Sequence, residues 1–426
     1  MQNKLLRSLS FSILLASMLT SCSVGNTTVA ADSTSSVGEQ TSPPNSASVV
    51  RCNASSQEGY YNSDIYYGEG ASICYLDYET MQDVVLCSSP NCAHNSDACP
   101  AFYPFDGRTL LGGVRVVGDT LLALQTVPGE NTVPHIDRLG LDGSYQNCLA
   151  EFGANQQLPG DIETDYYTDG SFLYFVLNDV DPETAKRSGR VVSVSLNSGE
   201  VQTVYESPEA VTQLKIFTAF ERSLVLYEVQ AQSLSDVSER FLVRNIDTGD
   251  EQEIDWRSDD TTATMANGRY LWTVDQTAQT LIRCDMVVND TRQYSLADLC
   301  GQVQLQYGDI LEIYISPLSF TDEACFVEFS VPDEDGNRHP IFYTFQLSDG
   351  TFTPFSLYMT FNQTIIPVFA QTPRGLLVQK DWLPVPRGNS ELYLPQWALI
   401  LPENYLRSSP EWIATGQMDL QTTPAD

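Results

Sequence analysis

Basic side chains are scarce in this chain, and histidine is nearly absent. Its 426 residues include 22 lysines and arginines, 55 aspartates and glutamates, and three histidines, for a formal charge of −33. This charge repels phosphate polymers, which argues against nucleic acid and against anionic lipid headgroups as partners. So few histidines leave little material for histidine-based catalysis, and no HExxH, GxSxG, GxGxxG or Walker pattern is present.

Long apolar runs are also missing. The stretch over residues 11–19 is too short to span a bilayer, and no later stretch approaches that length. It follows Lys4 and Arg7 and runs into small residues before Cys22, an order that resembles the lipobox of bacterial lipoproteins. The resemblance implies that residues 1–21 are a signal peptide and that the Cys22 thiol carries a diacylglyceryl lipid. It also implies attachment to the extracytoplasmic face of the cell membrane through that lipid alone. An ordinary secretory signal with a coincidental cysteine is the alternative.

Cysteine is present in a number that does not indicate a complete disulfide framework. Ten cysteines less Cys22 leave nine, an odd number. Several of them, such as Cys284 and Cys325, lie within apolar strand-like runs. We interpret these as small buried hydrophobic residues.

A weak internal repeat follows a segment of low complexity. Residues 22–58 are rich in serine and threonine and lack periodicity, which predicts a flexible tether. From Gly59 onward, a polar turn followed by an apolar or aromatic strand recurs about every fifty residues. The turns are centred on Asp64, Asp119, Asp169, Arg222, Asn267, Asp322 and Arg374. Copies at such a period indicate a repeat architecture.

A second signature lies within most copies and defines the fold. It is an alternating strand, an Asp or Asn turn with glycine, and another strand, seen best over residues 192–200. Each unit thus holds about four short strands, the content of one propeller blade, and helical periodicity is nearly absent. We therefore predict an all-β fold, a seven-bladed β-propeller of four-stranded blades over residues 59–426. Six or eight blades, or a pair of β-sandwiches, are the alternatives.

The blade assignment predicts a functional face. If the Asp/Gly turn joins strands A and B, the B–C loops and D–A connectors share the opposite end. The longest loops belong to that set, at residues 126–134, 178–187, 229–239, 331–339 and 380–390. Long loops on one rim of a rigid scaffold are the usual place for binding. The residues predicted for this binding rim are Asp179, Asp181, Asp333, Asp335, Trp382 and Arg387.

Two rim segments allow more specific hypotheses. Residues 333–337, Asp-Glu-Asp-Gly-Asn, are similar to the start of a calcium loop, but the distal glutamate is absent. A plain hairpin loop is the favoured interpretation there, and a calcium site the lesser one. Trp382 could stack on a sugar ring, although a packing role is at least as common for a loop tryptophan.

One compact group of metal-ligand side chains stands out. Cys87, Cys92, His94 and Cys99 follow the spacing C-x4-C-x-H-x4-C, in the predicted connector between blades 1 and 2. Three thiolates and an imidazole match the ligand set of a closed, structural zinc site. Disulfides of these cysteines with Cys52, Cys74 or Cys148, or unmodified thiols, are the alternatives.

At this cluster the chain resembles a family of uncharacterised bacterial lipoproteins with a WD40- or YVTN-like β-propeller. The resemblance rests on residues 73–80, which lead into Cys87–Cys99 and residues 100–102, and on the ending over residues 398–405. It implies a propeller fold and an extracytoplasmic address, and it brings no established activity.

We therefore expect a lipid-anchored binding module for a protein or a cell-surface glycan, rather than an enzyme. An exported carbohydrate-active hydrolase or lyase is the alternative. That alternative predicts carboxylates together with an arginine or tyrosine at the mouth of the central channel.

Overall fold

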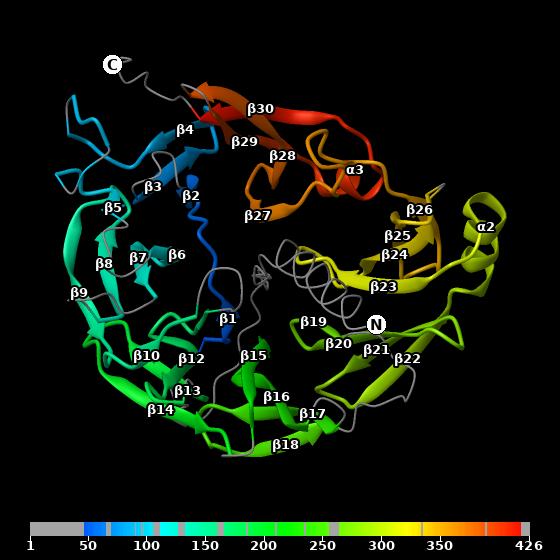
Figure 1. The fold of residues 1–426 in the computed structure, drawn as a ribbon, viewed down its shortest axis with the longest axis horizontal. Coiled ribbons are helices and arrows are strands. Elements are labelled where there is room, and N and C mark those ends of the chain that lie inside the picture. Colours follow the sequence, from blue (N-terminus) through cyan, green and yellow to red (C-terminus); the bar gives the residue numbers. More distant parts are fainter. Residues whose placement is uncertain are drawn as a thin grey trace, which may run out of the picture.

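The chain folds into a closed ring of β-sheet blades (Figure 1). The computed structural model describes residues 47–64, 70–89, 91–94, 96, 98–104, 111–126, 133–159, 166–184, 186–208, 211–233, 236–254, 264–333, 335–387 and 390–418. The predicted signal peptide, Cys22 and the tether up to residue 46 lie outside these residues. Five sheets each form one blade and an eight-stranded sheet forms two, so the predicted seven-bladed β-propeller is confirmed.

The blades follow one another in chain order. Blades 1 and 2 contain β2 (Gly59–Asp64), β3 (Gly70–Asp77), β4 (Gln82–Val85) and β5 (Phe102–Pro104), then β6 (Leu111–Val117), β7 (Thr120–Gln125), β8 (His135–Gly140) and β9 (Tyr145–Glu151). Blades 3 and 4 contain β10 (Gln156–Gln157), β11 (Tyr167–Thr168), β12 (Phe172–Val180), β13 (Arg187–Ser195) and β14 (Val201–Glu206), then β15 (Gln213–Phe220), β16 (Ser223–Ser233), β17 (Asp236–Asn245) and β18 (Glu251–Ile254).

The second half of the ring has the same plan. Blades 5 and 6 contain β19 (Met265–Asn267), β20 (Tyr270–Asp275), β21 (Thr280–Asp285) and β22 (Asp290–Ser295), then β23 (Glu312–Pro317), β24 (Ala324–Pro332), β25 (Arg338–Gln346) and β26 (Phe352–Pro354). Blade 7 contains β27 (Val368–Thr372), β28 (Gly375–Arg387), β29 (Ser390–Ile400) and β30 (Trp412–Met418). Helix α2 (Ala297–Tyr307) precedes blade 6, and α3 (Pro402–Leu406) precedes β30. No helix in the described part of the chain is long and apolar enough to cross a membrane.

The core is divided into layers, one between each pair of neighbouring blades. For example, one buried cluster joins Leu122 and Leu124 of blade 2 to Leu173 and Phe175 of blade 3. Six further clusters join the other neighbouring pairs around the ring. A central strand such as β12 therefore has a neighbour on both faces and is apolar over most of its length, whereas an outer strand such as β14 is largely exposed. Cys284 and Cys325 are buried in these layers, as predicted from their apolar surroundings.

The recurring turns are held by short side chains. In blade 4, Asn245 Oδ1 accepts hydrogen bonds from the backbone N–H groups of Asp247 (2.9 Å) and Thr248 (3.0 Å), and Gly249 has a φ of 75°. An aspartate or asparagine at this position satisfies the turn backbone locally, and glycine accepts the positive φ without strain. This explains why the Asp/Asn and glycine signature could be read from the sequence.

The predicted tether is wrong in its last part. Residues 47–56, which we call the N-terminal strap, lie inside the ring along four successive blades (Figure 1). The backbone hydrogen bonds run from Val49 N to Glu221 O (2.5 Å), Cys52 N to Tyr166 O (2.6 Å), Val116 N to Asn53 O (2.7 Å) and Tyr61 N to Ala54 O (2.7 Å). Strand β1 (Val50–Arg51) also pairs with β11. Val49 is 1% exposed, so the folded domain begins before the predicted boundary at Gly59.

Arg222 fastens the beginning of the strap. Its guanidinium donates to the carbonyl of Ala47 (2.8 Å), to Asp169 of blade 3 (2.9 Å) and to Asp247 of blade 4 (2.7 and 2.9 Å). Arg222 lies in the A–B turn of blade 4. The strap therefore enters the ring at the end that carries the A–B turns.

The B–C hairpins lie at the opposite end, because the strands of each blade are antiparallel. Four of the five predicted long loops are extended β-hairpins and not irregular loops: β12–β13, β16–β17, β24–β25 and β28–β29. Most of residues 126–134 lie outside the described part of the chain. The hairpin of blade 7 extends furthest, since β28 and β29 pair as far as Arg387 and Ser390 while their neighbours stop at Val378 and Gln396.

The ring closes where blade 7 meets blade 1. The outer strands β30 and β4 pair in parallel, and Trp397 Nε1 donates a hydrogen bond to the buried carboxylate of Asp83 (2.9 Å). Gly416 makes the close approach possible, because a Cβ at this position would lie 1.9 Å from the carbonyl oxygen of Met81. Only a residue without a side chain fits at that point.

We predict that Gly416→Ala weakens this closure. The added methyl group forces β30 away from blade 1, and we expect the free energy of unfolding to fall by at least about 2 kcal/mol. The measurement is urea unfolding followed by tryptophan fluorescence. Gly301→Ala in α2 is the control, because its Cβ meets nothing within 4 Å. That variant should be unchanged or slightly stabilised, and equal unfolding midpoints for both variants would contradict the closure argument.

Candidate functional site

The Cys/His cluster lies in an excursion from the outer strand of blade 1. Both β4 and β5 pair with β3, and between them Ile73 O accepts from Leu86 N (2.9 Å) while Ile73 N donates to Ala101 O (2.9 Å). Residues 87–100 therefore leave and rejoin the same strand position. The prediction that the cluster occupies the connector to blade 2 is wrong. The three-residue strand β5 returns the chain to blade 1 first.

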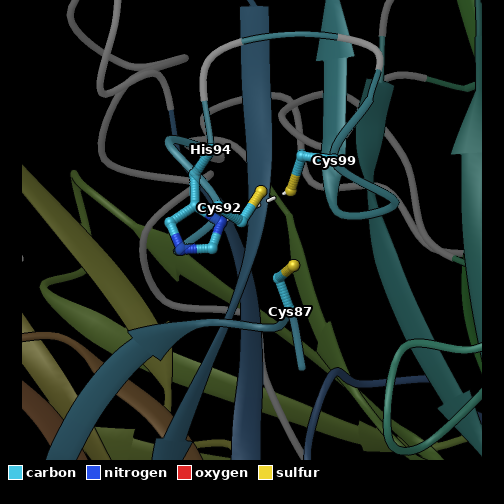
Figure 2. Close-up of side chains that lie close together, drawn as sticks. All are labelled: Cys87, Cys92, His94 and Cys99. Atoms are coloured by element: carbon cyan, nitrogen blue, oxygen red, sulfur yellow. Dashed lines mark hydrogen bonds between the residues drawn. The ribbon is translucent and has the colours of Figure 1, made fainter. Parts of the chain in front are cut away.

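Tight turns bring the four side chains of the excursion together. Cys92 N donates to Ser89 O (3.3 Å) and Cys99 N to Ser96 O (2.9 Å), while His94 has a positive φ of 55°. The sulfur atoms of Cys87, Cys92 and Cys99 and a ring nitrogen of His94 all lie within 4.8 Å of one another. Figure 2 shows the three thiols and the imidazole turned toward a common centre.

This geometry fits a four-coordinate metal ion. His94 Nδ1 lies 3.4 Å from Cys99 Sγ, a separation close to that of two ligands on one tetrahedral ion with bonds of about 2.0–2.3 Å. All nine cysteines of the described residues are free thiols, including Cys52, Cys74 and Cys148. A Cys3His group that could hold a metal is therefore present, and it consists of the four residues predicted from the sequence.

The pKa shifts of Cys87 and His94 favour the deprotonated forms that bind a metal, whereas the pKa shift of Cys99 opposes it. Burial raises the pKa of the Cys87 thiol, but hydrogen bonds from Ser89 and the two neighbouring thiols outweigh it, and the net shift is downward. Burial lowers the pKa of His94, which favours the neutral imidazole that a metal requires. Burial raises the pKa of Cys99 to about 12, so this thiol needs the positive charge of an ion to lose its proton.

Four protein ligands leave no open position on the ion for water or substrate. Such a site supports structure and not catalysis. Here it would tie together the two halves of an interrupted strand, one of which, β4, makes the ring closure with β30.

The six predicted rim residues lie on three separate hairpins, and several stabilise their own turn. Asp181 Oδ1 accepts from the backbone of Glu183 (2.8 Å) and Thr184 (2.9 Å). Asp179 pairs with Arg190 and accepts from Gln156 (2.8 Å). Both are on blade 3, on the other side of the ring from blade 6 (Figure 1).

The remaining rim residues are on blades 6 and 7. Asp333 Oδ1 accepts from the backbone of Asp335 (2.9 Å) and Asn337 (2.7 Å), which closes a hairpin turn, and Asp335 is exposed beside it. Trp382 is half-buried and packs against the core between blades 6 and 7. This is the packing role that was the alternative to stacking on a sugar. Arg387 ends β28, and its side chain lies outside the description. Asp179, Asp181, Asp333 and Trp382 thus have local structural partners, and the predicted rim residues are spread over separate hairpins.

Sequence reasoning missed a polar group at the channel-side start of blade 6. Tyr314 Oη donates to Glu312 Oε2 (2.6 Å), and Arg338 pairs with the same carboxylate. Glu328 is the strand partner of Tyr314, so its side chain is on the same face of the sheet. Burial, followed by the nearby charge of Glu312, raises the pKa of Glu328 to about 7. The sequence feature that could have indicated this group is Glu328, a charged residue within the mostly apolar strand β24.

A glutamate at the corresponding place in blade 4, Glu228, has different hydrogen-bond partners. Glu228, completely buried in β16, accepts from Tyr205 Oη (2.6 Å) and Arg240 Nε (2.5 Å). A buried charge held by two such donors is a structural ion pair. Glu328 has a like charge as its neighbour instead, and perturbed carboxyls of that kind are more frequent at functional sites.

Comparison with known proteins supports the fold and goes no further. No family model matches the chain, and no curated protein matches it. An oligogalacturonate lyase from Vibrio parahaemolyticus is similar to this chain with a TM-score of 0.50 at 10% identity, over 85% of this chain and 93% of the other. An oligogalacturonate lyase in complex with manganese gives 0.48 at 12% identity, covering 85% and 92%. The β-propeller domain of the Trilobed protease from Pyrococcus furiosus gives 0.46 at 10% identity, covering 88% and 99%.

We predict a pH-dependent loss of stability from Glu328. Its pKa is raised from 4.5 to about 7 in the folded protein, so the folded state binds more protons than the unfolded state between these values. Stability from this group is present below pH 4.5 and is lost as the pH rises through 7. Relative to Glu328→Gln, the protein should lose on the order of 2 kcal/mol between pH 5 and 8. Urea unfolding at both pH values measures this, and parallel pH curves would contradict it.

Proposed function

We propose that this protein is a lipid-anchored, extracytoplasmic β-propeller that binds a protein or glycan of the cell envelope through its B–C hairpins. The lipid on Cys22 is its only attachment to the membrane, and nucleic acid is not a partner. The observation that carries the proposal is the extension of the B–C hairpins of blades 4 and 7 beyond the other strands of their blades. The tips of such arms lie beyond the propeller core, and they expose hydrogen-bonding edges and side chains to a partner.

The direction of the chain supports this arrangement. The strap enters the ring at the A–B turn end, where Arg222 holds Ala47, and the B–C hairpins are at the opposite end. Ala47, the first described residue, therefore lies at the end away from the hairpins. An anchor at one end and binding arms at the other leave the arms accessible from outside the membrane.

We propose further that the Cys3His group holds one structural zinc ion. Three thiolates and an imidazole form the usual ligand set of closed zinc sites. The ion would link the two ends of the excursion, beside the buried cluster of Cys99, Ala101 and Phe102. It would fasten β4 and β5 to each other beside the contact with blade 7.

A second candidate function is carbohydrate cleavage, and one observation favours it. Glu312, Glu328, Tyr314 and Arg338 combine a carboxylate pair with a tyrosine and an arginine on the innermost strands of blade 6, and Glu328 has a raised pKa. A protonated carboxyl near neutral pH can donate a proton to a leaving group. The binding function remains the preferred one, because Glu312 is already engaged by Tyr314 and Arg338.

Zinc analysis tests the metal proposal. We expect about one zinc per chain in full-length protein carrying Cys22→Ser, purified without chelator or added metal, and protected thiols in a parallel titration. Cys87→Ser should lose both the metal and the protection, while Cys148→Ser in β9, outside the cluster, should keep both. Paired half-cystines among Cys87, Cys92 and Cys99 without metal would replace the zinc site with a disulfide.

Envelope fractionation tests the binding function. The lipidated protein should sediment with membranes, and Cys22→Ser should release it. Immobilised Cys22→Ser protein should retain an envelope component. A variant in which residues 384–393 of the blade 7 hairpin are replaced by the two-residue turn Asn-Gly, next to the Leu383–Leu394 pair, should retain at least about tenfold less.

The same experiment separates the two candidate functions. Retention without new reducing ends or unsaturated sugars supports binding alone. Product formation that Glu312→Gln abolishes would favour the enzyme. Equal retention by the shortened variant and by the parent would reject the hairpin face.

A further inference from the structure

An exposed pair of aromatic rings lies on the hairpin face of blade 7. Phe361 is 50% exposed at the tip of the segment between β26 and β27, and Tyr393 of β29 is 38% exposed. Their ring centroids are 4.6 Å apart, and the ring planes are tilted by 52°. Single exposed apolar side chains are ordinary on a protein surface. Two rings in contact are a different case, because together they offer a continuous aromatic platform.

The tip that carries Phe361 is a tight turn. Met359 N donates to Thr364 O (2.8 Å) and Gln363 N to Met359 O (3.0 Å), while Tyr358 bridges Ile365. Met359 is buried beneath the turn, so its base is anchored in the core between blades 6 and 7. The turn therefore presents Phe361 at a defined place.

Asp381 ties this tip to the blade 7 hairpin. Its carboxylate accepts from the backbone of Phe361 (3.0 Å), Thr360 (3.2 Å) and Trp382 (2.9 Å). Burial raises the pKa of Asp381, but these hydrogen bonds outweigh it and lower the pKa, so the group stays ionised. The position of Phe361 against Tyr393 is thus fixed before any ligand arrives, which reduces the entropy that binding must overcome.

The chemistry around the rings indicates which ligand they suit. The exposed neighbours on the tip, Thr360, Asn362 and Gln363, are uncharged hydroxyl and amide side chains. The C–H face of a sugar ring meets the negative face of an aromatic ring favourably, and its hydroxyls suit amides and alcohols. Two rings are too small an apolar area for a stable protein interface, which buries about 1,200–2,000 Å². A formal charge of −33 and the carboxylate of Asp381 disfavour polyanions.

We infer that Phe361 and Tyr393 form a binding platform for a neutral glycan chain. This inference rests on the proposed function and specifies its ligand and its place. The platform lies between the longest arm of the hairpin face, which carries Tyr393, and the tip that carries Phe361. There it can engage a polysaccharide by stacking, without closing a pocket around it.

Native gel electrophoresis with polysaccharide in the gel tests this inference. The probes are three soluble neutral polysaccharides, galactomannan, xyloglucan and mixed-linkage β-glucan, with polygalacturonate as the acidic comparison. The full chain carrying Cys22→Ser should be retarded by at least one neutral probe and not by polygalacturonate. Phe361→Ala and Tyr393→Ala should each weaken that retardation by about tenfold in apparent affinity.

Tyr145→Ala is the matched control, since this tyrosine is 60% exposed on the outer strand of blade 2, and its loss should change nothing. Thermal unfolding of each variant verifies the fold, and Phe361→Ala, at an exposed tip, keeps the test valid if Tyr393→Ala is unstable. The inference is overturned if no neutral probe retards the protein, if polygalacturonate retards it more strongly, or if both ring variants behave like the parent. Retention of an envelope component without retardation by any neutral probe would reject the platform while leaving the proposed function intact.

Discussion

The whole structure depends on burial of both faces of each blade against its two neighbours. A single four-stranded sheet leaves both faces apolar and cannot be stable alone, so each layer of the core needs the next blade to complete it. A row of blades would expose two such faces at its ends, and only a closed ring removes them. The contact between blades 7 and 1 is therefore the constraint on which the other layers depend. It is made by Gly416 against Met81 and by Trp397 donating to Asp83.

Two unusual features lie next to this closure or reinforce it. The Cys/His excursion interrupts the outer strand of blade 1, the strand that pairs with β30. A metal ion there would hold together the two segments of the outer strand, β4 and β5. The N-terminal strap connects blades 4, 3, 2 and 1 from inside the ring, so that separation of these blades also requires breaking its backbone hydrogen bonds. Arg222 fastens the strap with a guanidinium shared among three elements.

The two ends of the ring consequently have different roles. The A–B end holds short turns, satisfied by aspartate and asparagine side chains, and the entry of the strap. The B–C end carries long hairpins, whose tips have no core function. Polar groups along the hairpins differ in their surroundings: Glu228 is paired with Arg240 and accepts a hydrogen bond from Tyr205, whereas the charge near Glu328 is that of Glu312. The candidate binding surface and the candidate chemical group are therefore both at this end, on blades 6 and 7.

Local patterns in the sequence determined the number of blades, the class of fold and the four ligands of the Cys/His group. These features depend on residues close in the chain, such as Asn245 with Thr248, or Cys87 with Cys92. Only the tertiary structure decided the place of the strap, the interruption of the outer strand, the charge of Glu312 near Glu328 and the contact of Phe361 with Tyr393. The strap has a tether-like composition, and it folds because the inner edges of distant blades offer unpaired backbone groups to it. These two pairs bring together residues from separate elements, whose relative placement depends on strand register and on packing across the ring, which no local pattern specifies.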